Sequence, residues 1–458
     1  MEILNLPKGS KIHFIGIGGV SMSSLAEICL ANGYLVSGSD INETKLTSKL
    51  RENGAIIYIG QKAENINSPD AVVYTAAISN DNPEFIAAKE TGVPFVERSV
   101  FLGELMKIYA ENCCISGTHG KTTTTAMVAL VMLEAGIDPT ILVGGEVKEL
   151  SSNYKIGSNN MLVTESCEYV ESFLKFYPKS AIINNIEEDH LDYFKDLEHI
   201  KLSFRKFAEL IPSSGIIIAN GQDENVKDTL KGLNNVKYFG IDGDFDYKAC
   251  NLKYNSFGFG EYDLYKDNEF LTHITLNVPG EHNVLNSLGA AAICHCHGCD
   301  VTSIVKGLNT FKGTGRRFEY IGKNNGADIF DDYAHHPTEI KTTLKACRNY
   351  GNKNVIAIFQ PHTYTRTKAL FNEFLEAFDD ANELILTDIY AAREKDTGVI
   401  SSKMLADALK IKGINVKYIK TFDEIVEYLN KKASPDDLII TIGAGDVYKI
   451  SSRLYQDA

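Results

Sequence analysis

Residues 113–125 read Cys-Cys-Ile-Ser-Gly-Thr-His-Gly-Lys-Thr-Thr-Thr-Thr. The segment begins as an apolar strand, turns through Gly117 and Gly120, and continues into TTTTAMVALVMLEAG, which is typical of a helix. Glycines let the backbone approach a ligand closely, and the first N–H groups of a helix attract an anion. The order strand, glycine loop, helix therefore predicts a phosphate-binding loop within a parallel α/β sheet.

The polar side chains of this loop suit the same ligand. Lys121 can reach terminal phosphates, and the Thr122 hydroxyl can join a magnesium shell. The loop is shorter than the common G-x-x-x-x-G-K-[ST] pattern, because Ile115 stands at the position of the first glycine. A plain strand-to-helix turn is the alternative. The residues expected to contact phosphate are Gly117, Thr118, His119, Gly120, Lys121, Thr122 and Thr123.

Short apolar runs alternate with helical stretches on both sides of this loop, which predicts three α/β domains. A helix that ends near Lys107 precedes the strand CCISG, and the alternation restarts after the glycines of KGTGRRF. We therefore expect a Rossmann-like N-terminal domain, a central domain of the P-loop type and a doubly wound C-terminal domain. Their expected ranges are 1–107, 108–313 and 314–458.

The later strands and helices can also be placed. The central domain carries the strands MLVTESCE, SAIINNI and GIIIAN, then hairpins from Asp246 to Val278 and a helix from Asn283. In the last domain, amphipathic helices such as TKALFNEFLEAFDD separate the expected strands. Those strands are ADIFDDY, VIAIFQ, ELILTDI, VKYIK and DLIITIG.

A second glycine-rich loop follows the first strand, KIHFIG. Its residues Gly16, Gly18, Gly19 and Ser21 can present N–H groups to a pyrophosphate at a helix N-terminus. Asp40 ends the next strand, where a carboxylate conventionally accepts hydrogen bonds from a ribose or another nucleotide group. These residues form a candidate site for a diphosphate-containing ligand. A strand-to-helix turn without a ligand is the alternative.

Two polar residues lie where strands of the central domain should end. Glu165 in VTESCEYVESF and His190 in NNIEEDHLDYF could both hold magnesium beside the phosphate loop, together with Thr122. His190 could equally be structural. The segment Cys294-His295-Cys296-His297-Gly298-Cys299 invites a zinc interpretation, but it ends an apolar helix on which these side chains point in different directions. We therefore do not expect a metal there.

Bulk composition limits the function classes. A net charge of -14 over 458 residues excludes a broad nucleic-acid surface, although a local pocket for phosphates remains compatible with it. No apolar run approaches the roughly 20 residues that span a bilayer. The start of the chain lacks the pattern of an export signal, and the nine cysteines include an apolar pair that is typical of a strand. We expect a cytoplasmic protein, monomeric or homodimeric.

Seven motifs occur in order along the whole chain: GTHGKTTT, NNIEEDHLD, GEHNVLNSLGA, GTGRRFE, DDYAHHPTE, QPHTYTR and GAGD. Together they resemble the Mur ligase family. The resemblance implies a UDP-binding first domain, a central ATP-binding domain and a C-terminal domain that closes on the nucleotide and brings an amino acid. Within the family, the GIGG loop, DDYAHHPTE and QPHTYTR are most similar to members that add L-alanine to UDP-N-acetylmuramate.

The resemblance also implies individual roles, with ATP and Mg²⁺ as cofactors. Asn283 would lie near adenine, Asp332 would hold the ATP ribose, and Arg317 would face the phosphates from the hinge. His335 and Arg366 match positions of the amino-acid site, and either His335 or His336 could instead be structural or bind a carboxylate. Where the family often has arginine, Thr363 stands here. The residues expected to take part in catalysis are Lys121, His190, His335 and Arg366.

The implied reaction joins a carboxylate to an amine through an acyl phosphate, giving ADP and phosphate. A related ligase that attaches another amino acid or a recycled peptide to the same sugar nucleotide is one alternative. A nucleotide-binding regulator and a nicotinamide-dependent oxidoreductase are others. The phosphate loop at residues 117–123, in addition to the N-terminal glycine loop, and the histidine-rich last domain favour the ligase over both of these.

Overall fold

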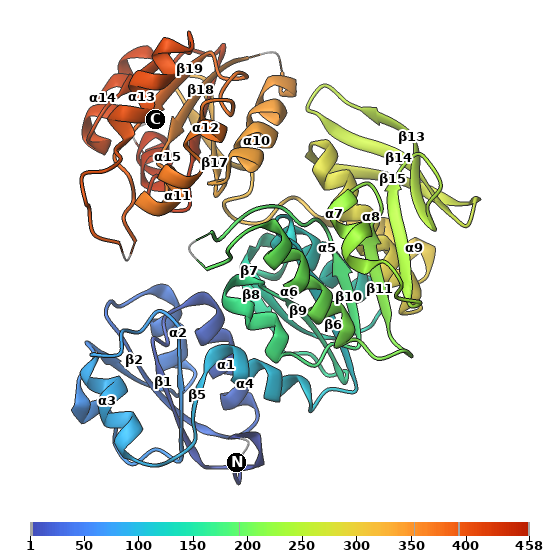
Figure 1. Cartoon of the computed structure of the whole chain (residues 1–458), viewed down its shortest axis with the longest axis vertical. Helices are drawn as coiled ribbons and strands as arrows, with labels where there is room; N and C mark the ends of the chain where they lie inside the picture. The colour runs from blue at the N-terminus through green and yellow to red at the C-terminus, as the bar shows by residue number, and fades with distance from the viewer. Residues whose placement is uncertain (1–2, 192, 352, 393, 457–458) are drawn as a thin grey trace.

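The computed structural model describes residues 3–191, 193–351, 353–392 and 394–456. Its strands form three sheets, and each sheet uses one continuous part of the chain. Figure 1 shows the N-terminal sheet at the bottom, the central sheet in the middle and the C-terminal sheet at the top left. The prediction of three successive α/β units is confirmed. No helix among the described residues is long and apolar enough to cross a membrane.

The N-terminal sheet has the strand order β3-β2-β1-β4-β5, and all its pairings are parallel. This order places β1 at the centre, so the loop after it lies at the switch point where ligands bind in such sheets. The elements are η1 (Ile3–Asn5), β1 (Lys11–Ile15), α1 (Val20–Ala31), β2 (Leu35–Asp40), α2 (Lys45–Glu52), β3 (Ile56–Ile59), η2 (Ala63–Asn65), β4 (Ala71–Tyr74), α3 (Pro83–Glu90), β5 (Phe95–Glu97) and α4 (Arg98–Met106).

The central sheet has ten strands in the order β15-β14-β13-β12-β11-β10-β6-β9-β7-β8. The elements are β6 (Glu111–Ser116), α5 (Lys121–Glu134), β7 (Thr140–Val147), η3 (Lys148–Leu150), β8 (Ser152–Lys155), β9 (Met161–Glu165), η4 (Tyr169–Lys175), β10 (Ser180–Ile183), α6 (Leu197–Glu209), β11 (Ile216–Asn220), α7 (Glu224–Leu230), β12 (Val236–Ile241), β13 (Tyr247–Tyr254), β14 (Phe259–Lys266), β15 (Glu269–Pro279), α8 (Glu281–Cys296) and α9 (Val301–Thr310). The predicted hairpins are confirmed, because β13, β14 and β15 pair antiparallel.

One part of the central unit differs from the prediction. The helix expected from Asn283 is α8, which ends at Cys296, and it is followed by a further helix, α9, that was not predicted. Gly298 has φ +84°, a left-handed conformation that ends α8, and Asp300 caps α9 by accepting a hydrogen bond from the Ser303 N–H.

The C-terminal sheet has the order β16-β17-β21-β18-β19-β20, in which only β16 is antiparallel to its neighbour. The predicted helix TKALFNEFLEAFDD is interrupted, because Leu370 (φ −101°, ψ 25°) separates two short helices. The elements are β16 (Glu319–Asn324), β17 (Ala327–Asp332), α10 (Pro337–Asn349), β18 (Asn354–Phe359), α11 (Tyr364–Ala369), α12 (Phe371–Phe374), β19 (Glu383–Leu386), α13 (Ser402–Ile411), β20 (Val416–Tyr418), α14 (Phe422–Lys432), β21 (Asp437–Ile442) and α15 (Tyr448–Gln456).

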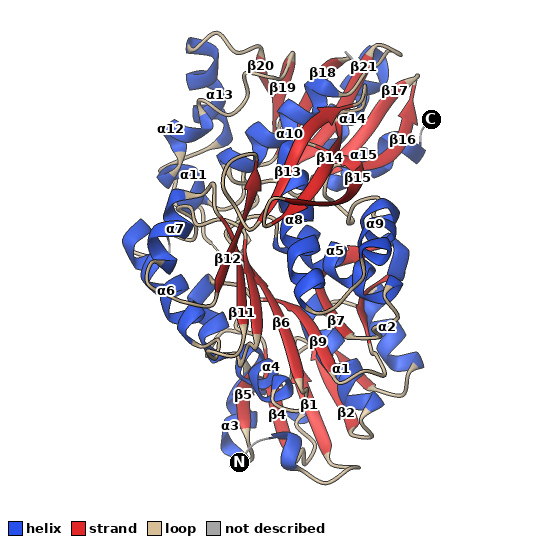
Figure 2. Cartoon of the chain, turned by 90° about the vertical axis from the view of Figure 1, so that its right-hand side faces the viewer, coloured by secondary structure: helices blue, strands red, loops and turns tan. Residues whose placement is uncertain are grey.

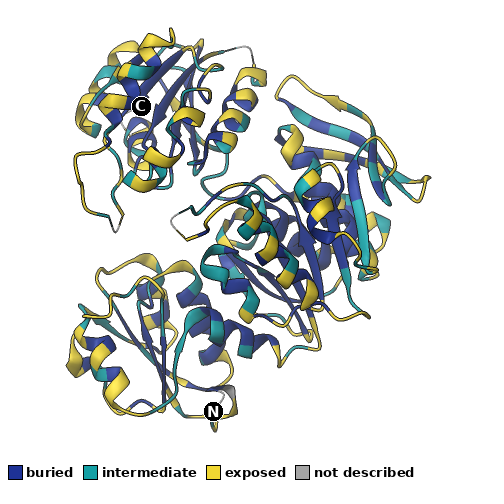
Figure 3. Ribbon diagram, in the orientation of Figure 1, coloured by how far each residue is buried: buried dark blue, intermediate teal, exposed yellow. Residues whose placement is uncertain are grey.

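The parallel strands are largely buried between layers of helices, whereas the hairpin strands β13 to β15 are partly exposed, as Figures 2 and 3 show. Successive residues of β6 face opposite layers, so Cys113 and Cys114 are both fully buried in different hydrophobic clusters. Both are free thiols, as expected of strand residues. Because β6 lies between the parallel strands β9 and β10, the carboxyl ends of all three meet at one edge. The phosphate loop and Glu165 follow two of these ends.

Helix α4 packs tightly against the central unit. A Cβ atom added at Gly103 would lie 2.1 Å from the carbonyl oxygen of Lys175 in η4, and Phe101 and Phe173 belong to one hydrophobic cluster. The first two sheets therefore share a core. A boundary near Lys107, directly after α4, is compatible with this packing and stays a prediction.

Candidate active site

The predicted phosphate loop joins β6 to α5, and two glycines shape it. Gly117 has φ +142° and Gly120, the N-cap of α5, has φ +79°. Added Cβ atoms would lie 2.9 Å from Asn184 Cβ and 2.5 Å from Asn286 Oδ1, respectively. The loop is therefore restricted to glycine at both positions, and it presents the N-terminus of a 14-residue helix to an anion.

Lys121 is held at the start of α5. Its ammonium donates to the carbonyl oxygens of Gly117 (2.5 Å) and Thr118 (3.1 Å) and lies 2.9 Å from Glu168 Oε2. Burial disfavours the ammonium, but the charge and hydrogen bond of Glu168, together with Cys167 and Glu165, outweigh burial and raise the pKa of Lys121 above its ordinary value. Glu168 was not predicted from the sequence. Its position three residues after Glu165, the carboxylate that ends β9, could have indicated it.

Thr122 and Glu165 lie together beside this lysine. Burial raises the pKa of Glu165, while hydrogen bonds from the Gly144 N–H and the Thr122 hydroxyl oppose that rise. The Gly144 N–H donates to Glu165 Oε1 at 2.5 Å. A buried carboxylate next to a hydroxyl supplies the hard oxygen ligands that Mg²⁺ prefers, so these two residues fit the predicted ion.

His190 lies beside Glu168 and Asp189. Its Nε2 is 3.9 Å from Glu168 Oε1 and 3.7 Å from Asp189 Oδ2. Its ring also packs on Tyr169, with a centroid distance of 4.5 Å. His190 is thus connected to the lysine through a shared carboxylate, and its place in a magnesium shell stays a prediction.

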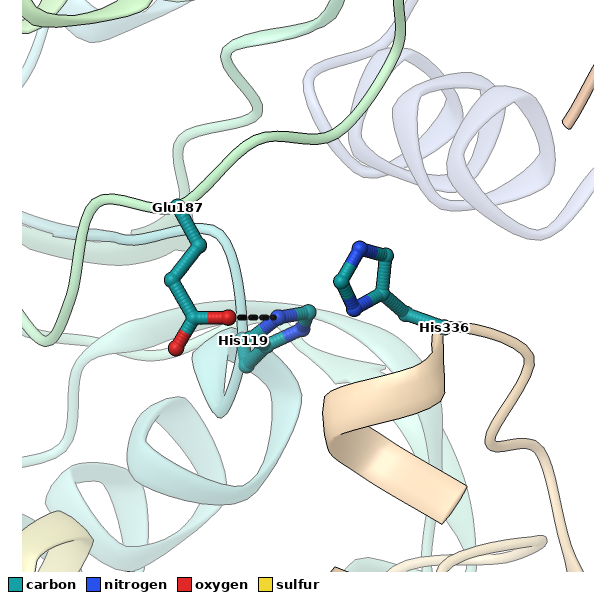
Figure 4. A group of neighbouring side chains, drawn as sticks. All are labelled: His119, Glu187 and His336. Carbon is teal, nitrogen blue, oxygen red and sulfur yellow. Dashed lines mark ion pairs between the residues drawn. The ribbon is translucent and has the colours of Figure 1, made fainter. Parts of the chain in front are cut away.

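His119 connects the phosphate loop to the C-terminal unit. Its Nδ1 lies 3.1 Å from Glu339 Oε1 and its Nε2 lies 3.5 Å from Glu187 Oε2. Burial disfavours the charged ring, but both carboxylates favour it and raise the pKa of His119 to about 10. Figure 4 shows Glu187 and His336 pointing toward the same ring. Neither glutamate was predicted, because the contact with Glu339 joins residues 220 positions apart.

A cavity of about 560 Å³ lies between the central and C-terminal units. The residues predicted to bind ATP that line it are His119, Gly120, Thr122, Thr123, Asn283, Arg317 and Asp332. Gly117, Thr118 and Lys121 are not among the residues that line it. The structure thus brings the predicted adenine, ribose and hinge residues to one cavity, whose aromatic lining includes Phe239, Phe318 and Tyr350.

Asp332 is fixed at the end of β17. Its carboxylate accepts hydrogen bonds from the N–H groups of Ala334 (2.7 Å) and Phe318 (2.8 Å). Burial raises the pKa of Asp332 to about 6, against the opposing effect of Arg317. The carboxylate is therefore mostly ionised at neutral pH and can accept hydrogen bonds from a ligand hydroxyl.

Arg366 and His335 lie at the border with the central unit. Arg366 Nη2 lies 2.9 Å from Asp189 Oδ1, and its Nη1 lies 3.2 Å from His362 Nδ1. The His335 Nδ1 lies 3.0 Å from the carbonyl oxygen of Tyr333. Burial lowers the pKa of His335 to about 4, so its ring is neutral at pH 7. With Nδ1–H donating to the carbonyl, the Nε2 lone pair remains available.

The N-terminal glycine loop has the predicted geometry at the switch point. Gly16 has φ +84°, and Asp40 Oδ2 accepts a hydrogen bond from the Gly18 N–H at 2.9 Å. Asp40 therefore holds the loop, a role that sequence reasoning did not assign. The Ser21 hydroxyl accepts a hydrogen bond from Arg98 Nη1 at 3.1 Å, which adds a cation to this site that was also missed.

The histidine side chains at the C-terminal end of α8 do not point to a common site. His295 Nδ1 lies 2.9 Å from the Tyr247 hydroxyl, whereas His297 Nε2 lies 2.9 Å from the Ser180 hydroxyl. Among the described residues, the metal-ligand cluster found in the structure is a different one, composed of His119, Glu187 and His336.

A phosphate loop at the carboxyl edge of a parallel sheet, completed by a cavity that a second α/β unit closes, defines a class of nucleotide-binding, phosphoryl-transferring enzymes. Comparison with known families narrows this class. The model of the Mur ligase family catalytic domain matches residues 11–110, that of the Mur ligase middle domain matches 115–294, and that of the Mur ligase glutamate ligase domain matches 316–445. The chain belongs to the Mur ligase family.

Individual relatives are similar over the full length. A UDP-N-acetylmuramate–L-alanine ligase of Acetivibrio thermocellus is 51% identical, covering 100% of this chain and 98% of the relative. The crystal structure of a UDP-N-acetylmuramate-alanine ligase from Thermotoga maritima has a TM-score of 0.84 at 30% identity, covering 98% of each chain. A murein peptide ligase from Psychrobacter arcticus has a TM-score of 0.75 at 26% identity, also covering 98% of each.

Proposed function

We propose that this enzyme joins the carboxylate of UDP-N-acetylmuramate to the amine of L-alanine, converting ATP to ADP and phosphate. The observation that carries the proposal is one cavity between the central and C-terminal units. His119, Thr122, Asn283 and Asp332 all line it. The full-length similarity to ligases of this named activity supports the choice of substrates. The reaction would take place in the cytoplasm as a step of peptidoglycan precursor synthesis, and hence serve cell shape and division.

Each of the three units would bind a different substrate. Residues 1–107 would bind the UDP-sugar at the Gly16 loop, 108–313 would bind ATP, and 314–458 would close on the nucleotide and bring the amino acid. Arg98, through its contact with Ser21, would supply positive charge for the sugar diphosphate.

The first chemical step would activate the sugar carboxylate. A carboxylate oxygen attacks the γ-phosphorus, the bond to the β-phosphate oxygen breaks, and an acyl phosphate and ADP form. Lys121 and the N-terminus of α5 would stabilise the charge that develops on the phosphoryl oxygens. Glu168 positions the lysine for this purpose. Mg²⁺ bound by Thr122 and Glu165 would supply further positive charge at these oxygens.

The second step would form the amide. The amine of L-alanine attacks the acyl carbon, the tetrahedral species releases phosphate, and the amine proton must be accepted by a base. His335 is a candidate, since its ring is neutral and its Nε2 lone pair is available. Arg366, held by Asp189, would bind the amino-acid carboxylate.

Phosphate release by the purified protein tests the proposal. ATP and Mg²⁺ are supplied throughout, and UDP-N-acetylmuramate and L-alanine are added separately and then together. We expect release only with both, accompanied by a product heavier by one alanyl residue. Replacement of L-alanine by a peptide tests the alternative of a peptide ligase, which the resemblance to the Psychrobacter arcticus enzyme keeps relevant. Turnover with the peptide but not with L-alanine would overturn our choice of substrate.

A further inference from the structure

His119, Glu187 and His336 come from three separate segments but point to one place (Figure 4). Each offers one ligand atom, and these atoms all lie within 4.8 Å of one another. His119 belongs to the phosphate loop, Glu187 follows β10, and His336 is the N-cap of α10 in the C-terminal unit. The mechanism proposed above uses none of the three as a metal ligand.

A metal ion would displace the proton that Glu187 and Glu339 favour on the His119 ring, and the geometry around the ring suits a metal-binding imidazole. Its Nδ1 lies 3.1 Å from Glu339 Oε1, while its buried Nε2 makes no hydrogen bond and faces Glu187 Oε2 at 3.5 Å. Metal-binding histidines commonly donate their second N–H to a carboxylate, which orients the ring. Glu339 therefore has the position of such an orienting group.

The spacing also suits a small ion. A tetrahedral ion with bonds of about 2.0 Å requires ligand atoms about 3.3 Å apart, close to the 3.5 Å between His119 and Glu187. His336, in a cluster whose ligand atoms lie within 4.8 Å of one another, must approach by up to about 1.5 Å. Its Nε2 is engaged by the Glu188 carbonyl oxygen at 3.0 Å, but its Nδ1 accepts only a long bond of 3.3 Å from the Thr338 N–H. A metal ion at Nδ1 would replace this N-cap hydrogen bond of α10.

We propose that His119, Glu187 and His336 form a binding site for a borderline transition-metal ion such as Zn²⁺. Two imidazole nitrogens and one carboxylate match Zn²⁺, whereas Mg²⁺ prefers the oxygen ligands of Thr122 and Glu165. The site is thus distinct from the magnesium site. Because its ligands belong to the central and C-terminal units, a bound ion crosslinks the phosphate loop to α10 and restrains the separation of the two units.

Calorimetric titration of the full-length, nucleotide-free protein with Zn²⁺, in excess Mg²⁺, tests the proposal. We expect one ion per wild-type chain. Glu187→Gln and His336→Gln should each weaken the affinity at least about 100-fold, since each removes a direct ligand. Glu188→Gln is the matched control. It makes the same charge change one residue away, where the side chain is exposed, and should bind Zn²⁺ like the wild type.

Two outcomes would overturn the proposal. One is wild-type affinity in Glu187→Gln, a variant expected to fold because 35% of the Glu187 side chain is exposed. The other is loss of binding in Cys296→Ser, which would place the ion at the exposed thiol of α8. Hydrogen exchange gives an independent readout of crosslinking. Zn²⁺ should slow exchange at the start of α10 in the wild type and leave Glu187→Gln unchanged.

Discussion

The ammonium of Lys121 lies 2.9 Å from the carboxylate of Glu168, and this pair joins the first turn of α5 to the segment that follows β9. The side chains are only 16% and 3% exposed, so neither charge is well solvated without the other. Stability and catalysis therefore depend on the pair in different ways, since folding needs charge balance and phosphoryl transfer needs the ammonium itself.

Lys121→Ala should lower kcat at least about 100-fold by removing a charge that stabilises the transferring phosphoryl group. It should also destabilise the fold by about 3 kcal/mol, because Glu168 is left buried and unpaired. The double variant Lys121→Ala/Glu168→Gln should recover most of the stability and none of the activity. Urea unfolding and phosphate-release assays measure the two effects. Recovery of activity in the double variant would contradict the role of the lysine.

Glu165→Gln should raise the Mg²⁺ concentration required for half-maximal activity by about tenfold or more, because a charged oxygen ligand is lost. Stability without Mg²⁺ should not fall, since burial already disfavours the Glu165 carboxylate and raises its pKa. Glu198→Gln, on the exposed start of α6, is the control for charge removal. An unchanged Mg²⁺ requirement in Glu165→Gln would place the ion elsewhere.

Arg366→Gln should raise the KM for L-alanine about tenfold while changing the KM for ATP little, as expected for loss of a charge-assisted hydrogen bond to the amino-acid carboxylate. Asp189→Asn breaks the same contact between the units but keeps the guanidinium, so its effect on the KM for L-alanine should be smaller. Equal effects of the two variants would mean that Arg366 acts only through the contact between the units.

The stability of the nucleotide-free protein should depend on pH through His119. Burial lowers its pKa, but Glu187 and Glu339 raise it from 6.5 to about 10 in the fold, and the ring of His336 lies 5.1 Å away. The contribution of the charged ring is therefore complete below pH 6.5 and is lost as the pH rises through about 10. Urea unfolding of the wild type and of His119→Asn between these limits measures the effect. The difference between the two proteins should shrink with increasing pH, and a constant difference would refute the assignment.

The sequence predicted the parts of the site that depend on local order. The phosphate loop follows from the succession of strand, glycines and helix, and Glu165 follows from its place at the end of β9. The contact of His119 with Glu339 could not be predicted in this way, because hydrophobic periodicity carries no information on which loops of two separate sheets meet. Glu168 was missed for a related reason. It precedes η4, in which Val170 and Glu171 adopt positive φ angles that no simple pattern indicates.

The shared walls of the nucleotide cavity have a consequence for the order of events in turnover. Because Asp332 and the phosphate loop belong to different sheets, a nucleotide that contacts both would hold the two walls of the cavity together. While the nucleotide is bound, its adenosine and phosphates would link the C-terminal unit to the central unit. We therefore expect compulsory-order kinetics with ATP as the leading substrate, and a departure of ADP that slows in viscous solvent.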